Sequence, residues 1–383
     1  MRSKHEIGAM VAAALVLVVG MGFGRFAFTG LYPLMVSGQQ ISIEGGSYAA
    51  SANYAGYLTG ALLAALLSGI PSRRLCVFAT VATVIGLGVL ALPLAEWLIV
   101  AIRGLAGLFS AMAMVGASQW LIHDRRLHTG APALYSGVGV GIFLSAEIIA
   151  IGRVSSLSSG AIWLVLAVAA LVLTAVSVVM QARTERSRPH QIQARAAAAH
   201  EAPPLGATRL IVVYGLAGLG YIVTATYLPL LVGRALAAID PVHIWAVFGL
   251  GAVPSCFLWH ALHERWGTRT SLLVNLVVQG IGVALPVFHT PASYIASALL
   301  VGGTFMGTVT IAMPAARRLA AGVRFNMLAI MTASYGVGQI VGPLMANALY
   351  AGTASFDASL VVAALALLAA GALCLIPPTR RKS

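Results

Sequence analysis

Three charged side chains fall inside long apolar stretches of this sequence, and they are the residues whose types could do chemistry. They are Arg25, Arg103 and Glu147. An ion deep in a bilayer costs roughly 2.5–3.5 kcal/mol even on lenient insertion scales, so such residues mark ion or solute pathways more often than lipid-facing surface. The rise of a helix places the three side chains roughly 9–16 Å below one membrane surface, which allows them to share a layer.

Glu147 is the acid that could carry a proton through this layer. A carboxyl group there can be neutral when it is enclosed and ionised when water or an arginine reaches it. We therefore hypothesise that Glu147 is a proton-coupling residue. The alternative is that Glu147 only neutralises Arg25 or Arg103 as a buried structural ion pair.

The two arginines could bind an anionic substrate, because a guanidinium presents a planar fork of donors to a carboxylate or phosphate. For Arg25 the alternative is to lock helices together through backbone carbonyls or Glu147. For Arg103 the alternative is stronger, because a long side chain nearer the surface can reach the interface without touching a substrate.

Uncharged polar side chains in the same segments could complete a binding pocket. Tyr221 occupies the position in the second half of the chain that corresponds to Arg25 in the first. Asn53 would join two helices by a hydrogen bond before it would contact a ligand, and each of the others could equally serve packing. The further substrate-binding candidates are Tyr32, Thr224, Tyr227, Thr304, Thr308 and Gln339.

The composition of the chain indicates the environment of these residues. The chain has 383 residues, of which 60% are hydrophobic and 9% charged, and its mean hydropathy is +0.93, so it is a polytopic membrane protein. The net charge of +13 lies in short loops and indicates topology rather than nucleic-acid binding. Cys76, Cys256 and Cys374 are far apart and lack metal-site spacing, so we expect no disulfide, no metal and no cofactor.

Twelve apolar windows are long enough to span a bilayer, which predicts an all-α protein of twelve transmembrane helices. All but four of the 23 lysines and arginines fall on one side if both termini are cytoplasmic. The exceptions are Arg153 and Arg234 outside, and Arg25 and Arg103 within the membrane. The windows lie at about 7–36, 46–69, 75–94, 96–121, 131–152, 160–181, 208–233, 242–262, 270–288, 292–314, 326–349 and 355–376.

The chain repeats itself across its centre. Gly22, Gly24 and Pro33 recur 196 positions later as Gly218, Gly220 and Pro229. We therefore divide the chain into a six-helix half at 1–181, a polar cytoplasmic linker at 182–207 and a second half at 208–383. A parallel duplication of this kind places a solute site at the interface of the halves.

Several motifs resemble those of the major facilitator superfamily (MFS). One is the loop after the eighth window, with Glu264, Arg265, Gly267 and Arg269. The loop after the second window keeps Arg73 and Arg74 but lacks the acid. Arg103 followed by Gly107 is similar to the helix 4 pattern of proton-coupled members. Two further runs are similar to the bacterial YbfB/YjiJ branch of the superfamily: Gly22-Phe23-Gly24-Arg25-Phe26-Ala27-Phe28-Thr29 and Ser51-Ala52-Asn53-Tyr54-Ala55-Gly56-Tyr57-Leu58-Thr59-Gly60-Ala61.

The resemblance implies a multi-pass secondary transporter of the bacterial inner membrane, with helices 1 and 4 lining a central cavity and the two loops acting in gating. Together with the buried charges it favours proton symport of a small organic anion. The alternatives are a proton-driven exporter of drugs or metabolites and, more remotely, a membrane-embedded enzyme or a sensor. We expect solute, protons and the lipid bilayer as partners, a monomer, and no enzymatic activity.

Overall fold

The computed structural model describes residues 4–66, 69–185, 205–235, 240–320, 323 and 327–376. Every regular element in these ranges is a helix. This confirms the predicted all-α architecture. The predicted linker at 182–207 lies largely outside the described residues; α7 extends to Glu185 and α8 begins at Ala207.

Apart from the stretch between α7 and α8, the helices follow one another along the chain with short connections. Their bounds are α1 Lys4–Leu17, η1 Val18–Phe26, α2 Ala27–Ser37, α3 Ile43–Leu66, α4 Ser72–Leu90, α5 Glu96–Ser118, η2 Gln119–Asp124, η3 His128–Gly130, α6 Ala131–Val154, α7 Ser159–Glu185, α8 Ala207–Ala235, α9 Pro241–Ala284, η4 Leu285–Phe288, α10 Pro291–Ala320, α11 Met327–Thr353 and α12 Asp357–Leu375.

Ten helical stretches in the described ranges are long and apolar enough to cross a membrane. One of them contains α9, which consists of two segments, because Gly267 has φ 73° and interrupts its helical backbone. Helix α3 is long but is not among the ten. The protein is thus a multi-pass membrane protein, and the count of twelve spans stays a prediction.

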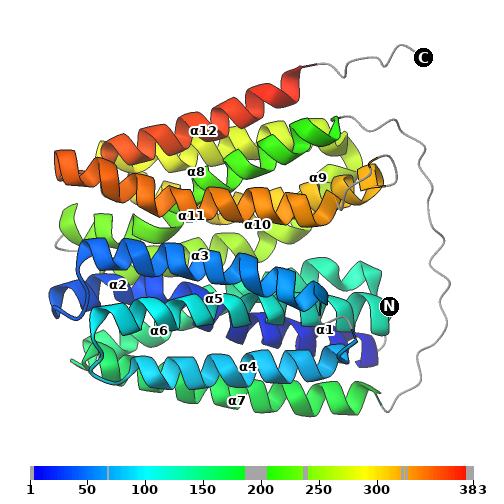
Figure 1. The fold of residues 1–383 in the computed structure, drawn as a ribbon, viewed down its shortest axis with the longest axis horizontal. Helices are drawn as coiled ribbons and strands as arrows, with labels where there is room; N and C mark the ends of the chain where they lie inside the picture. Colours follow the sequence, from blue (N-terminus) through cyan, green and yellow to red (C-terminus); the bar gives the residue numbers. More distant parts are fainter. Residues whose placement is uncertain are drawn as a thin grey trace.

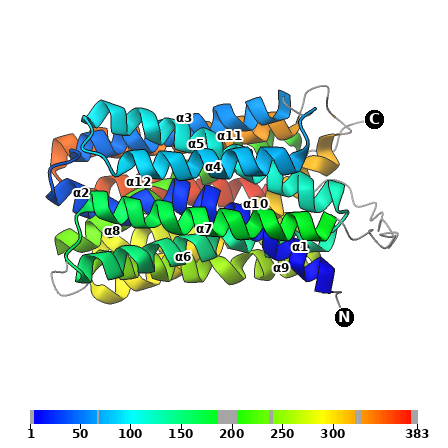
Figure 2. The same cartoon turned by 90° about the horizontal axis from the view of Figure 1, so that it is seen from below.

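The helices form two groups that lie side by side, with α1 to α7 in one half and α8 to α12 in the other (Figure 1). Viewed at right angles, the helix axes remain roughly parallel along the long dimension of the molecule (Figure 2). Helix α1 begins and α12 ends at the same end of the bundle, which we call the termini end. The opposite end, where α2 is followed by α3, is the distal end.

The first membrane helix is built from three pieces. Between α1 and α2, the segment η1 is a π-helix of nine residues, and such wide turns occur mostly at functional sites. All nine of its residues are buried. Glycine permits this burial, because an ideal Cβ on Gly22 would lie 2.3 Å from the Cα of Gly141 in α6.

Two pairs of helices carry the interface between the halves, α3 against α11 and α6 against α9. The first helix of each half also meets its counterpart, because the Thr29 hydroxyl donates to the carbonyl oxygen of Ala225 at 3.0 Å. These residues are 196 positions apart, which is the predicted repeat. A contact between equivalent positions is expected near a pseudo-twofold axis.

Candidate functional site

Arg25 lies in η1 at the interface of the halves and is only 3% exposed. Aromatic rings surround its guanidinium carbon, which lies 4.1 Å from the ring centroid of Tyr57, 4.9 Å from that of Tyr54 and 5.3 Å from that of Phe26. Each such contact stabilises a cation by about 0.5–2 kcal/mol. The first half therefore holds Arg25 mainly with the faces of aromatic rings.

Two nitrogens of Arg25, Nε and Nη2, are buried and have no hydrogen-bond partner. These two atoms share one edge of the guanidinium, the edge that binds a carboxylate with two parallel bonds. Within the described part of the chain, no carboxylate forms an ion pair with Arg25. The site thus presents a buried positive charge with a vacant two-donor edge.

Arg103 behaves differently, because its terminal nitrogens are used by the backbone of the first helix. Nη1 donates to the carbonyl of Gly24 at 2.7 Å and Nη2 to that of Arg25 at 2.6 Å. Its guanidinium also lies 4.6 Å from the ring centroid of Phe28. A π-helix displaces carbonyls from regular bonding, so Arg103 supports the segment that carries Arg25.

The polar contacts of the π segment continue on both sides. Asn53 in α3 donates to the carbonyl of Arg103 at 2.8 Å, which is the interhelical role that was weighed for it. On the other side, Trp245 of the second half donates from Nε1 to the carbonyl of Phe26 at 3.1 Å. Side chains from α5 and α9 therefore bind three consecutive carbonyls of the first helix.

Across the interface, the second half faces this region with aromatic rings. Phe305 lies 6.0 Å from Phe26 between ring centroids, and Tyr221 stacks on Phe305 at 5.6 Å. Tyr335 stacks on Tyr221 at 5.8 Å. The rings of Phe26, Phe305 and Tyr221 therefore connect the segment that carries Arg25 to its predicted counterpart in the second half.

Two other predicted pocket residues accompany Tyr221. Gln339 donates from Nε2 to the Tyr221 hydroxyl, while its Oε1 is buried and unpartnered. The hydroxyl of Thr224, one helical turn along α8, is also buried without a partner. The Gln339 oxygen can therefore accept, and the Thr224 hydroxyl can accept or donate, a hydrogen bond that the described residues do not supply.

Glu147 does not join this cluster. It is half-buried in α6 and shares a helix face with Leu144 and Ile151, which are 36% and 65% exposed. No ion pair between described residues links it to Arg25 or Arg103. The expectation that all three charges point inward therefore holds for the arginines only.

The remaining predicted pocket residues have other partners. Thr308 donates to Asn275 Oδ1 at 2.6 Å, and Asn275 donates to the carbonyl of Thr304 at 3.0 Å, which joins α10 to α9. Tyr32 donates to the carbonyl of Ile43 at 2.8 Å near the distal end. These contacts are structural and leave Thr304, Thr308 and Tyr32 outside the cluster around Arg25.

Tyr227 belongs to a set of polar contacts that close the distal side of the interface. Its hydroxyl donates to Ser47 at 2.7 Å. The other members of this set are Thr29 with Ala225, Tyr54 with Thr226 at 3.2 Å, Ser51 with the carbonyl of Ile340 at 3.1 Å, and Arg153 with Asp240 at 3.0 Å. We call this set the distal seal.

The sequence model of a family described as "uncharacterised MFS-type transporter YbfB" matches residues 17–375. The chain belongs to this family. Among solved structures, the fold is similar to the crystal structure of a mutant of the nucleoside transporter NupG, with a TM-score of 0.68, 12% identity, and coverage of 97% of this chain and 99% of that chain. This likeness concerns the fold alone. No curated protein matches the chain in direct sequence comparison.

Family membership makes the protein a multi-pass secondary transporter of the MFS and confirms the predicted resemblance. The cluster around Arg25 lies between the two halves, and transporters built from such repeats bind solute in this region. The family supports a transporter over an enzyme or a sensor. Within the described residues, no group of three His, Cys, Asp or Glu side chains could hold a metal ion.

The loop after the eighth window, to which the resemblance assigns a gating role, is organised within its own half. Gly267 provides the left-handed turn between the two segments of α9, and Arg269 donates to the carbonyls of Cys374 and Leu375 at the end of α12. Glu264 lies 3.4 Å from His260 across one helical turn. Arg265 is the next residue after Glu264 in α9.

The loop after the second window, to which the resemblance also assigns a gating role, leads into α4. Arg73 and Arg74 lie in the first turn of this helix. The acid that its motif lacks has a substitute nearby in space, because the Ser72 hydroxyl donates to Asp124 at the end of η2. The contact ties the start of α4 to the end of the fourth span. A carboxylate at a helix N-terminus is favourable, so a different element supplies the missing charge.

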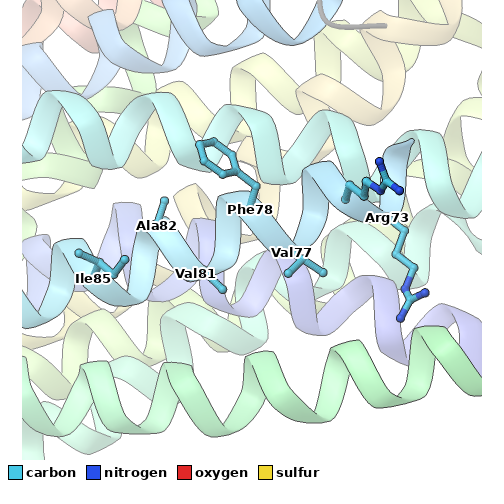
Figure 3. Close-up of a pocket in the computed structure, with 7 residues that line it drawn as sticks. Arg73, Val77, Phe78, Val81, Ala82 and Ile85 are labelled. Carbon is cyan, nitrogen blue, oxygen red and sulfur yellow. The ribbon is translucent and has the colours of Figure 1, made fainter. Parts of the chain in front are cut away.

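The same arginines border a groove of about 450 Å³ on the outside of the bundle. Figure 3 shows its lining side chains along one face of α4, with the arginines at one end. Phe78 and Ile85 in this lining are 55% and 61% exposed. The groove faces away from the interface and is separate from the cluster around Arg25.

The cluster contains residues that the sequence did not single out. They come from four other helices and are Tyr54, Tyr57, Tyr335, Phe305 and Trp245. Tyr54 and Tyr57 lie in the run that resembles the YbfB/YjiJ branch, but none of the five stood out as a site residue, because aromatic residues in membrane helices usually pack against neighbours. The pairing of Arg25 with Tyr221 by the repeat was the one signal that pointed to this place.

Proposed function

We propose that this MFS transporter is a proton-coupled symporter of a small organic anion, with Arg25 as the anchor for the anion. The observation that carries the proposal is the vacant Nε and Nη2 edge of a guanidinium that is 3% exposed. A buried charge without a counter-ion costs free energy. A bound anion would remove that cost and would use both free donors.

We assign the proton to Glu147. Of the ten acidic residues in the chain, it alone lies well inside a described membrane helix, seven positions before the end of α6 at Val154. It is half-buried, and α6 packs directly on α9 of the other half. Movement of the halves would change its surroundings, as coupling requires.

Alternating access fits the contacts between the halves. The five contacts of the distal seal join the two halves. We propose that this conformation is closed at the distal end. With both termini in the cytoplasm, as the distribution of Lys and Arg predicts, the distal end faces outward. Arg103 then acts as a positioning residue that keeps the π segment, and hence Arg25, in place through both states.

The test uses the purified chain in liposomes that hold a pH-sensitive dye. A panel of small carboxylates is added outside, and symport predicts acidification inside. Substitution of Arg25 by glutamine is expected to raise the concentration for half-maximal flux by at least about 30-fold, because two hydrogen bonds to a charged group are lost. Arg25→Lys keeps the charge but loses the fork and should also weaken flux.

Glu147→Gln is expected to abolish solute-dependent acidification while solute exchange between the two sides persists. The matched control is Glu44→Gln, since Glu44 is exposed at the distal end. Alkalinisation on solute addition would indicate proton exchange and favour the exporter. Unchanged proton movement in Glu147→Gln would remove Glu147 from the mechanism, and an unchanged response in Arg25→Gln would remove the anion site.

A further inference from the structure

We propose that the anion is an aromatic monocarboxylate, bound edge-on to Arg25 with its ring against the rings of the second half. The inference rests on the proposed function and narrows its substrate class. The geometry supplies three requirements that the ligand must meet: the vacant edge of the Arg25 guanidinium, the use of the Arg103 terminal nitrogens by backbone carbonyls, and the flat aromatic surroundings.

The vacant edge selects a carboxylate. Nε and Nη2 present two parallel N–H groups about as far apart as the two oxygens of a carboxylate, so both bonds form at once. A neutral amide offers only one acceptor oxygen to the same edge, and its NH₂ group would face a donor. The geometry therefore favours the ionised acid over its amide.

The free donors of the site select a monocarboxylate. Arg103 donates from Nη1 and Nη2 to the carbonyls of Gly24 and Arg25 and leaves only its Nε buried without a partner, so it offers no two-donor edge to a second carboxylate. Arg25 is therefore the one guanidinium of the two that can bind a carboxylate with two parallel bonds. A second carboxylate would be buried without a partner, which is strongly unfavourable.

The walls of the site select a planar ring. Tyr54, Tyr57 and Phe26 cover Arg25 from the first half, and Tyr221 and Phe305 stack on each other across from it. Offset-stacked and edge-to-face aromatic pairs gain free energy beyond the area that they bury. A flat conjugated ring joined to a carboxylate gains these contacts, and a puckered aliphatic ring does not.

The test is calorimetric titration of the purified full chain with three matched probes. Benzoate has the ring and the charge, cyclohexanecarboxylate has the charge and a saturated ring, and benzamide has the ring without the charge. We expect benzoate to bind about 5- to 10-fold more tightly than cyclohexanecarboxylate, in line with one or two aromatic contacts. We expect no measurable binding of benzamide.

Variants assign each preference to its residues. Tyr221→Leu should reduce the preference for benzoate to about 2-fold or less, and Phe305→Leu repeats the test on the stacked partner in case the first variant misfolds. Tyr48→Leu is the control, because Tyr48 is 45% exposed near the distal end. Arg25→Gln should remove the binding of both carboxylates.

The outcomes separate the two proposals. Equal affinity for the two carboxylates, with both lost in Arg25→Gln, would overturn the aromatic inference and leave the anion site in place. Binding of benzamide as tight as that of benzoate, or no binding of either carboxylate, would overturn the anion site and the inference with it.

Discussion

At the scale of single residues, the two buried arginines divide the work between them. Both are nearly inaccessible, at 3% and 2% exposure. Arg103 donates from both terminal nitrogens to backbone carbonyls and leaves only Nε without a partner, whereas Arg25 leaves both Nε and Nη2 without one. A side chain that stabilises the fold uses its donors in the resting protein, and a side chain that waits for a ligand does not.

This division predicts that substitutions of the two arginines affect stability to different extents in the absence of solute. Arg103→Gln leaves the carbonyls of Gly24 and Arg25 without their charged donors, and should destabilise the protein by about 3 kcal/mol or more. Arg25→Gln removes an uncompensated buried charge and should leave the thermal unfolding midpoint close to that of the parent. The midpoints are measured by scanning fluorimetry without ligand; a larger loss in Arg25→Gln than in Arg103→Gln would refute the assignment.

At the scale of elements, the π-helix η1 organises the site. Its widened turn turns Arg25 toward the interface and leaves carbonyls for Arg103 and Trp245 to bind. The glycines that the sequence shows in this stretch serve close packing, as the approach of Gly22 to Gly141 demonstrates. The element therefore depends on neighbouring helices for its conformation.

Gly22→Ala tests this dependence. The added Cβ would lie 2.3 Å from the Cα of Gly141, so backbones must separate, which costs about 1–3 kcal/mol for an overpacked core. We expect a lower unfolding midpoint and, because Arg25 is displaced with η1, weaker carboxylate binding. The control is Gly86→Ala in α4, where nothing lies within 4 Å of an added Cβ. Equal behaviour of the two variants would contradict this account.

The sequence predicts much of this architecture and less of the site. Hydropathy predicts the spans, because lipid demands long apolar helices, and the repeat predicts the pairing of Arg25 with Tyr221. The sequence does not predict the π-helix η1. Its carbonyls are bonded by the side chains of Arg103 and Trp245, which are distant from η1 in the sequence. Glu147 is a second example. The sequence predicts the membrane helix that contains Glu147, but the side to which Glu147 faces depends on how α6 packs against its neighbours.

At the scale of the whole molecule, the distal seal holds the halves together at one end. It combines neutral hydrogen bonds such as Tyr227 with Ser47 and one ion pair, Arg153 with Asp240, whose side chains are 30% and 24% exposed. Each contact is weak by itself. A set of weak contacts suits a transporter, because the two states must stay close in free energy.

Loss of the ion pair should therefore shift the population toward opening at the distal end. Arg153→Gln removes a partly exposed pair of about 0.2–1 kcal/mol, which corresponds to a shift of up to about 5-fold. Ala50→Cys supplies the reporter, since Ala50 is 3% exposed and lies on the face of α3 that carries Ser47 and Tyr54. A membrane-impermeant maleimide added from the distal side should label it up to about 5-fold faster in Arg153→Gln.

The charge-swapped double variant, Arg153→Asp with Asp240→Arg, is the control that assigns the effect to the pair. It restores the attraction with the charges reversed, so labelling should return toward the parent rate. The native cysteines add little background, because Cys76, Cys256 and Cys374 are buried. Labelling that stays fast in the swapped variant would mean that Arg153 stabilises the closed distal end through contacts other than Asp240. The ion pair would then not contribute to closure of the distal end.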